Sequence, residues 1–238
     1  MTRIGFYDLD GTLVSGNIVL RYAFYARNLP SKARALLKCS RLLLSVPALI
    51  GLDFYSRRLF NEMFYRAYRG MKKEWLEGLA ESVFEKVIRP SIYPGAKALV
   101  EADRKQGFRP VLITGELDFV LRPVMRYFGF DHLICNSLVY QNGVATGEVV
   151  SPLIAEREKV AALMRVCGHY NADAAQSKAY SDSFSDVPML EAVGDPAAVN
   201  PDRRLRTLAV ERGWPILDLN RGDDGHPCRE TPNQIARV

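Results

Sequence analysis

The chain has 238 residues, of which 48% are hydrophobic and 25% charged, and its formal net charge is +5. This length suits one large domain or a core domain with an insertion, and this composition is typical of a soluble globular protein. The small positive charge suits an anionic substrate or a weak attraction to anionic membrane. No basic block interleaved with aromatic residues occurs, which argues against nucleic-acid binding.

The first predicted element is a short buried strand at 3–8 that ends in a pair of acids. The stretch GFYDLDGTLVSG places Asp8 and Asp10 two residues apart, so both side chains leave an extended chain on the same side. Two such carboxylates repel each other unless a cation joins them or one of them keeps a proton. Alone, the DLDGT sequence could equally be a turn in which aspartate accepts backbone hydrogen bonds.

From 17 to 89 the apolar residues recur at helical spacing, and Pro30, Pro47 and Gly70 divide this region into about four predicted helices. Residues 36–52 are the most apolar stretch, but their charge-free run is too short to span a bilayer. We expect a buried helix pair there, broken at Pro47. The alternative is a membrane-facing surface flanked by basic residues, namely Lys38, Arg41, Arg57 and Arg58.

The second half of the chain alternates between strands and helices. Strands are predicted at 109–114, 132–136, 178–182, 197–200 and 215–219, a hairpin at 138–150, and helices before Gly107, at 116–130 and at 156–168. This order predicts an α/β fold with a doubly wound parallel sheet. We expect a core of residues 1–15 and 91–219, an all-helical cap at 16–90, and a disordered polar tail at 220–238.

Ligands of such a sheet bind beyond the carboxyl ends of the strands. There the predicted elements gather Asp8, Asp10, Thr114, Lys159, Asp182 and Asp186. Several crowded carboxylates require a cation, and Mg²⁺ fits oxygen ligands with a phosphate. Lys159 is preferred over Arg157 and over Lys178, since Lys178 begins its strand and lies at the wrong end. A carboxylate can also attack phosphorus as a nucleophile.

In order and spacing, DLDGT at 8–12, Thr114, Lys159 and DSFSD at 182–186 resemble the four signatures of the haloacid dehalogenase superfamily. The helical insertion is similar to that of the subgroup which includes phosphoserine phosphatase. The resemblance covers about residues 3–217. It implies a Mg²⁺-dependent phosphomonoesterase that hydrolyses a small phosphorylated metabolite through an aspartyl-phosphate.

The resemblance also implies a role for each matching position. Asp8 would be the nucleophile and Asp10 the general acid and base. Mg²⁺ would be bound by Asp8, Asp182 and the backbone carbonyl of Asp10, while Asp186 would orient the metal's waters or Lys159. Thr114 and the Gly115 amide would hold phosphoryl oxygens, Lys159 would screen Asp8 from the phosphate, and Thr12 is assigned to substrate binding.

The sequence departs from phosphoserine phosphatases in the cap and in the second signature. Asn17 stands where those enzymes carry a glutamate that binds the substrate's ammonium group, and Thr114-Gly115-Glu116 replaces a serine and two glycines. Candidate specificity residues are Asn17, Arg21, Tyr22, Arg66, Tyr68 and Arg69, of which Asn17, Arg66 and Arg69 are predicted to bind substrate.

Several functions remain open at this point. The phosphate ester could be lipid-like or membrane-associated, or it could be phosphoserine itself. A non-catalytic binding protein is disfavoured by the intact acidic set, and a dehalogenase by Asp10, since carbon–halogen cleavage has no leaving oxygen to protonate. The four cysteines form no CxxC pair and the three histidines are scattered, and no secretory signal precedes the first strand, so we expect a cytoplasmic protein without zinc.

Overall fold

The computed structural model describes residues 2–220 and 228–229. Its main sheet has the strand order β3-β2-β1-β6-β7-β8-β9, in which every neighbouring pair is parallel except β8 and β9. The strands are β1 (Arg3–Tyr7), β2 (Phe108–Leu117), β3 (His132–Asn136), β6 (Lys178–Ser181), β7 (Asp195–Val199), β8 (Ile216–Asp218) and β9 (Cys228–Arg229). The predicted doubly wound α/β fold is confirmed.

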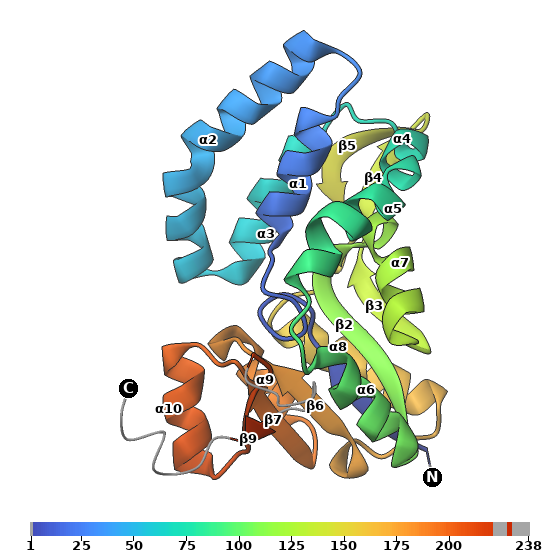
Figure 1. Ribbon diagram of the computed structural model, residues 1–238, viewed down its shortest axis with the longest axis vertical. Helices are drawn as coiled ribbons and strands as arrows, with labels where there is room; N and C mark the ends of the chain where they lie inside the picture. The colour runs from blue at the N-terminus through green and yellow to red at the C-terminus, as the bar shows by residue number, and fades with distance from the viewer. Residues whose placement is uncertain (1, 221–227, 230–238) are drawn as a thin grey trace.

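Helices cover both faces of this sheet because the strands are apolar on both sides (Figure 1). In β1, Tyr7 packs on one face with α6 (Ala96–Lys105) and α7 (Asp118–Phe128). Ile4 and Phe6 pack on the other with α8 (Arg157–His169), α9 (Val187–Glu191) and α10 (Arg203–Arg212). This two-sided burial fixes the strand ends, and hence the edge where Asp8 leaves β1.

All the helices between β1 and α6 form the cap. They are α1 (Ile18–Arg27), α2 (Lys32–Tyr55), α3 (Arg57–Tyr65), α4 (Lys73–Gly78) and α5 (Ala80–Val83). A short helical turn, Arg66–Tyr68, follows α3, and two more, Phe84–Ile88 and Arg89–Ser91, follow α5. The prediction of a break at Pro47 is wrong, since α2 continues through it. Proline lacks a backbone N–H, yet one missing bond does not end a helix that is supported by its neighbours.

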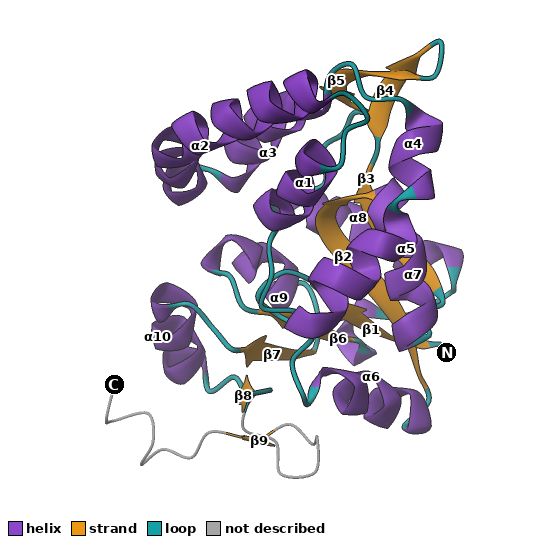
Figure 2. Ribbon diagram, turned by 45° about the horizontal axis from the view of Figure 1, so that its top comes forward, coloured by secondary structure: helices purple, strands orange, loops and turns teal. Residues whose placement is uncertain are grey.

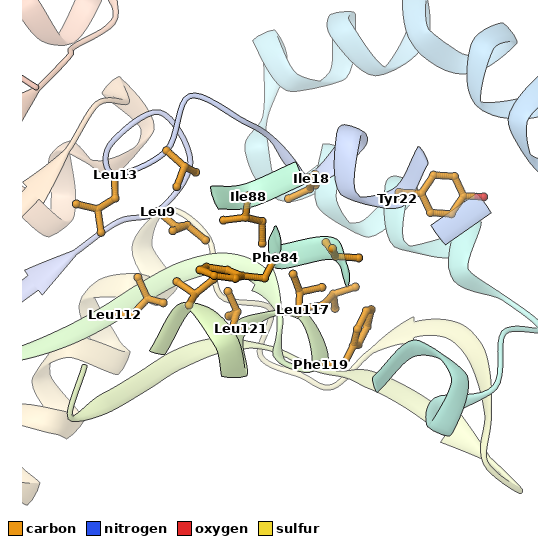
Figure 3. Packing of buried hydrophobic residues seen from close by; sticks show 14 of the residues in the cluster. Leu9, Leu13, Ile18, Tyr22, Phe84, Ile88, Leu112, Leu117, Phe119 and Leu121 are labelled. Atoms are coloured by element: carbon orange, nitrogen blue, oxygen red, sulfur yellow. The ribbon is translucent and has the colours of Figure 1, made fainter. Parts of the chain in front are cut away.

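The cap rests on the sheet through a shared apolar core. Figure 3 shows Phe84 and Ile88 of the cap lying over Leu112, Leu117 and Leu121 of β2 and α7. The hairpin of β4 (Leu138–Gln141) and β5 (Val144–Val149) also contacts the cap, because its backbone bonds the chain at 70–73. The two connections between cap and core run side by side, with Ser15 N donating to Ser91 O at 2.8 Å. The predicted division into a core of 1–15 and 91–219 and a cap of 16–90 stays a prediction.

Helix α2 lies at the outer edge of the cap, where α1 and α3 contact it from one side (Figures 1 and 2). The prediction of a buried helix pair at 36–52 is wrong. In the stretch Lys32–Leu52 only 6% is buried, and by length and composition alone it could cross a membrane. The predicted tail at 220–238 lies almost wholly outside the described residues, and within it Cys228–Arg229 pairs with β8.

Candidate active site

The carboxyl ends of three neighbouring strands bring the predicted acids and hydroxyl together. Asp8 follows β1, Thr114 lies near the end of β2 and Asp182 follows β6. These strands are adjacent in the order β2-β1-β6, and Asp8 N donates to Tyr180 O at 3.0 Å. Asp8 and Thr114 are both buried. The side chains therefore meet at one edge of the sheet, beneath the cap.

Lys159 joins two of the carboxylates. It lies in the first turn of α8, and its Nζ donates to Asp8 Oδ1 at 2.7 Å and to Asp186 Oδ2 at 2.6 Å. Ser181 also donates to Asp186 Oδ2, at 2.7 Å. All three bonds are buried. Arg157 is exposed, and Lys178 bonds Asp103 at the opposite end of β6. Lys159 is thus the cation that faces Asp8, and Asp186 holds it in place.

Burial and charge together set the protonation of this pair. Burial raises the pKa of Asp8 to about 6; Asp186 and Asp10 add to the rise, while Lys159 opposes it. Burial acts to lower the pKa of Lys159, but the carboxylates of Asp186 and Asp8 outweigh it and the net shift is upward. The Lys159 ammonium therefore stays charged and favours the ionised form of Asp8. A further cation at the site would favour that form more strongly.

Asp182 is held against the turn that follows β1. Thr12 Oγ1 donates to Asp182 Oδ1 at 2.9 Å and accepts from Asp182 N at 3.0 Å. Gly11 has φ +82°, and a Cβ there would overlap the Asp182 carboxylate. Residue 11 must therefore be glycine for two reasons: the left-handed conformation of its backbone and the close approach of the Asp182 carboxylate. Thr12 is fully buried and orients Asp182, and its predicted contact with substrate stays a prediction.

Asp10 is held by an arginine of the cap. Arg21 of α1 is 1% exposed, and its guanidinium donates to both Asp10 Oδ1 and Glu116 Oε2. Glu116 also accepts from Leu117 N at 2.8 Å. Burial raises the pKa of Asp10, and Arg21 counteracts this in part. A carboxyl with an elevated pKa is suited to carrying a proton to and from a reacting oxygen.

A cavity of about 330 Å³ lies between cap and core above these residues. Its polar lining includes Asp8, Asp10, Thr114, Gly115, Lys159 and Asp186 from the core and Asn17, Arg57 and Asn61 from the cap. Its apolar lining includes Ile18, Val46, Leu49, Ile50, Phe60 and Ile154. Asp182 lines an adjoining hollow that shares Arg57, Glu156, Ser183 and Ser185 with the cavity. The charged groups lie at the core end, and the cap supplies most of the apolar wall.

The other predicted cap residues lie elsewhere. Asn17 reaches the cavity, but its side-chain oxygen caps α1 by accepting from Val19 N and Leu20 N, both at 3.1 Å. Arg66 and Arg69 are exposed and line a separate cavity beside α2. Tyr22 and Tyr68 pack together in the apolar core of the cap, with ring centroids 5.0 Å apart. The structure does not bring Arg66, Arg69 or Tyr68 to the acids.

The residues present fit a hard divalent cation. Asp182 lies near two other acids. Burial raises the pKa of Asp182 well above the usual range, and the charges of Asp8 and Asp186 add to the rise. The Thr12 hydroxyl, which donates to Asp182, and the charge of Arg57 oppose this rise only in part. Among the described residues no three His, Cys, Asp or Glu side chains enclose a metal unaided. Mg²⁺ needs only one or two carboxylates, with water and phosphate completing its shell.

Two polar residues of this site were missed or given another role by the sequence analysis, and both carry the same signal. Asn61 is 2% exposed and shares one face of α3 and the following turn with Phe64, Tyr65 and Tyr68. Arg21 shares a face of α1 with Ile18 and Tyr25. A polar side chain at helical spacing within an apolar stripe indicates a buried partner. That pattern could have indicated that both side chains are buried; Asn61 lines the cavity, and Arg21 bonds Asp10 beside it.

Comparison with known proteins places the chain among hydrolases. The family description "haloacid dehalogenase-like hydrolase" matches residues 6–191. An "Inhibition of morphological differentiation protein" of Streptomyces azureus is 32% identical over 91% of this chain and 78% of its own length. A phosphoserine phosphatase (SerB1) of Mycobacterium tuberculosis is 28% identical over 92% and 71%. A histidinol-phosphatase of Neisseria meningitidis is 30% identical over 67% and 82%.

A solved structure has the same architecture. A protein of unknown function from Bordetella pertussis Tohama I is 28% identical, has a TM-score of 0.80, and matches 92% of this chain and 100% of its own. Its fold therefore includes both the sheet and the cap. The family match covers the first, second and fourth predicted signatures and Lys159. The chain belongs to the haloacid dehalogenase-like hydrolase family, and the predicted enzyme class, a phosphatase of this family, is confirmed.

Proposed function

We propose that the enzyme is a Mg²⁺-dependent phosphomonoesterase that transfers the phosphoryl group of a small ester to Asp8 and then to water. The observation that carries the proposal is the buried ammonium of Lys159 bonded to Asp8 and Asp186 at the edge of the cavity. One oxygen of Asp8 is held by Lys159, which leaves the other for attack. The names of the phosphatase relatives support the same reaction class.

The chemistry requires two displacements at phosphorus. In the first, an Asp8 oxygen forms a bond to phosphorus, the ester P–O bond breaks, and Asp10 gives its proton to the leaving oxygen. In the second, Asp10 takes a proton from a water molecule, the water oxygen bonds phosphorus, and the aspartyl–phosphate bond breaks to return Asp8 and inorganic phosphate. Thr114 and the Gly115 amide line the cavity where phosphoryl oxygens would lie.

Asp8, Asp182 and the Asp10 carbonyl would hold Mg²⁺, which would neutralise part of the phosphoryl charge. Lys159 supplies a second positive charge to the same end of the cavity. Both displacements move negative charge between oxygens in a buried site, where fixed cations act strongly. Asp186 fixes the Lys159 ammonium, since it accepts from Lys159 and from Ser181 with the same oxygen.

The substrate is proposed to be a small phosphorylated compound whose leaving group has an apolar part. Asn17 is neutral and its side-chain oxygen already caps α1, so it offers no carboxylate for the ammonium group of phosphoserine. The cap contributes Val46, Leu49 and Phe60 to the wall instead. A cytoplasmic location is part of the proposal, since Cys39, Cys135 and Cys167 are free thiols.

Asp8→Asn tests the mechanism. With p-nitrophenyl phosphate and Mg²⁺, we expect the release of inorganic phosphate to fall at least about a thousandfold, because the amide is not a nucleophile. Asp10→Asn should retain transfer from this good leaving group, slow the hydrolysis step, and accumulate a phosphoryl group on Asp8 that mass spectrometry detects.

The matched control is Asp131→Asn, which changes an acid in a partly exposed ion pair with Arg104. It should keep wild-type turnover. Wild-type rates in Asp8→Asn, with an unchanged melting temperature in all three variants, would reject Asp8 as the nucleophile.

A further inference from the structure

The outer face of α2 is apolar where a surface helix is normally polar. Leu36, Leu43 and Ile50 recur every seven residues and are 73%, 72% and 66% exposed, and Leu44 beside them is 82% exposed. The neighbouring face, at the same spacing, packs on α1 and α3 and contains Leu42 and Leu49. The helix is therefore apolar toward solvent as well as toward the cap, and in Figure 1 none of the helices and strands of the described residues lies over its outer side.

Positive charge surrounds this apolar face. Between Gly11 and Leu52 the sequence has no Asp or Glu but six basic residues; Arg21 is buried in the site, and the other five are Arg27, Lys32, Arg34, Lys38 and Arg41. Arg34 and Arg41 are exposed and lie seven residues apart, along one border of the leucine stripe. Apolar residues bordered by arginines on one helix are the pattern of a helix that lies in the interface of an anionic bilayer.

A second cavity, of about 400 Å³, opens along the side of α2. Lys38, Arg41, Arg66 and Arg69 line it, and none of the described residues in its wall is acidic. Lys38 Nζ donates to Ala67 O at 2.5 Å and to Arg69 O at 3.1 Å, which ties α2 to the turn after α3. The cations lie beside the leucine stripe, at a position suited to anionic lipid headgroups.

The charges favour a bilayer over a second copy of the chain. In a two-fold helix pair, the arginines bordering each stripe would face arginines of the other copy, and the sequence of α2 offers a single acid, Asp53, against five basic residues counted from Lys32 to Arg57. A transmembrane position is also disfavoured, because α1 and α3 cover the inner side of α2 and Lys38 is bonded to the cap. The helix is placed to lie along a surface.

The apolar stripe is continuous with the wall of the active-site cavity. Ile50 belongs to the exposed stripe and also lines the cavity of Asp8 and Lys159, where Val46 and Leu49 extend the apolar wall inward. A phosphate at Asp8 would therefore have its ester group directed along α2. This geometry suits a phosphomonoester whose apolar part stays in, or enters from, the bilayer.

We propose that α2 docks the enzyme on anionic membrane and that the substrate is a lipid-borne phosphomonoester. The docking surface consists of Leu36, Leu37, Leu43, Leu44 and Ile50 with the basic residues Arg34 and Arg41. The substrate class rests on the proposed phosphatase function. The docking itself does not, and it can be measured without catalysis.

The docking test uses the full chain and sedimentation with vesicles. Phosphatidylcholine vesicles that contain phosphatidylglycerol should sediment the wild type, vesicles of phosphatidylcholine alone should do so less, and added salt should weaken the binding. Leu43→Glu with Leu44→Glu keeps helix propensity and should weaken binding about tenfold or more. Arg34→Gln with Arg41→Gln should reduce the preference for the anionic vesicles.

The matched control is Met164→Glu with Val210→Glu, which makes the same kind of change at exposed sites on α8 and α10. It should sediment as the wild type does. Wild type that stays in solution with anionic vesicles would overturn the docking, as would equal sedimentation of the leucine double variant. A dimer in solution that this variant abolishes, without vesicle binding, would assign the face to a second copy.

The substrate test compares two phosphate esters. The leucine double variant should hydrolyse soluble p-nitrophenyl phosphate as the wild type does, but release phosphate from phosphatidic acid in anionic vesicles about tenfold more slowly. Wild type that hydrolyses the aryl ester but not phosphatidic acid would overturn the lipid substrate. Wild type that binds vesicles but hydrolyses neither ester would refute the phosphatase proposal and leave the docking intact.

Discussion

Among individual residues, Arg21 links the cap to two buried carboxylates, those of Asp10 and Glu116. Arg21→Met would remove the guanidinium that bonds Asp10 and Glu116, and breaking a buried pair costs about 3–5 kcal/mol. We expect a lower melting temperature and a kcat at least about tenfold lower, since Asp10 loses the group that orients it. Thermal unfolding and steady-state kinetics with p-nitrophenyl phosphate and Mg²⁺ measure both.

Lys178→Met is the control for this change. It removes a cation from buried Asp103 at the far end of the sheet, where Tyr7 and Tyr180 also donate to that carboxylate. It should lower stability and leave kcat unchanged. A normal kcat in Arg21→Met would show that Asp10 needs no orientation by the cap.

The sequence could identify the acids at the strand ends but not their partners. Asp8 and Asp10 are neighbours in sequence, and their spacing on a strand already indicates a shared function. Arg21 and Glu116 are 95 positions apart and their pairing depends on how α1 packs over β2. Such a contact is set by tertiary packing, and the local pattern indicates only that Arg21 is buried.

At the scale of elements, the turn after β1 builds the site through its backbone. Gly11→Ala would put a side chain where φ is +82° and where Asp182 makes its close approach. Left-handed backbone costs about 1–2 kcal/mol in a non-glycine residue, and here Asp182 must also move. We expect a moderate loss of stability, activity lower by at least about tenfold, and weaker activation by Mg²⁺ in a titration of the rate.

Gly213→Ala separates these two effects. Gly213 ends α10 with φ +67°, and a Cβ there meets nothing within 4 Å. This variant should lose similar stability and keep the wild-type response to Mg²⁺. If both variants lost activity equally, the close approach of Asp182 would have no special function.

Helix α2 shows where element prediction from the sequence failed. Pro47 and the apolar composition of 36–52 predicted two buried helices, yet the structure has one long exposed helix. Apolar composition cannot distinguish a helix buried in the core from a helix with an exposed apolar face, because charged residues are absent from both surfaces. The alternating strands were predictable since each one is apolar on both faces and is followed by a turn or helix signal.

For the whole molecule, we expect the cap to open and close over the cavity. Polar contacts that join cap and core beside the cavity include Arg21 with Asp10 and Glu116, Tyr65 OH with the Gly115 carbonyl, and Glu156 with Ser56 and the Arg58 amide. Each one ends next to the cavity. We therefore expect closure of the cap to fix the positions of Asp10 and Gly115, which face the phosphate in the proposed mechanism.

Tyr65→Phe tests this coupling with little damage to the fold. The Gly115 carbonyl would still accept from Asn136 Nδ2 at 2.8 Å, so no acceptor is left unpaired. Losing one hydrogen bond of about 1 kcal/mol should lower kcat/KM about fivefold and shift the melting temperature by only about 2–4 °C. Tyr25→Phe removes an equally buried hydroxyl whose acceptor, Leu76 O, lies within the cap. If closure matters, only Tyr65→Phe lowers kcat/KM; an equal loss in both variants would mean that the cap's internal packing, rather than its contact with Gly115, governs the rate.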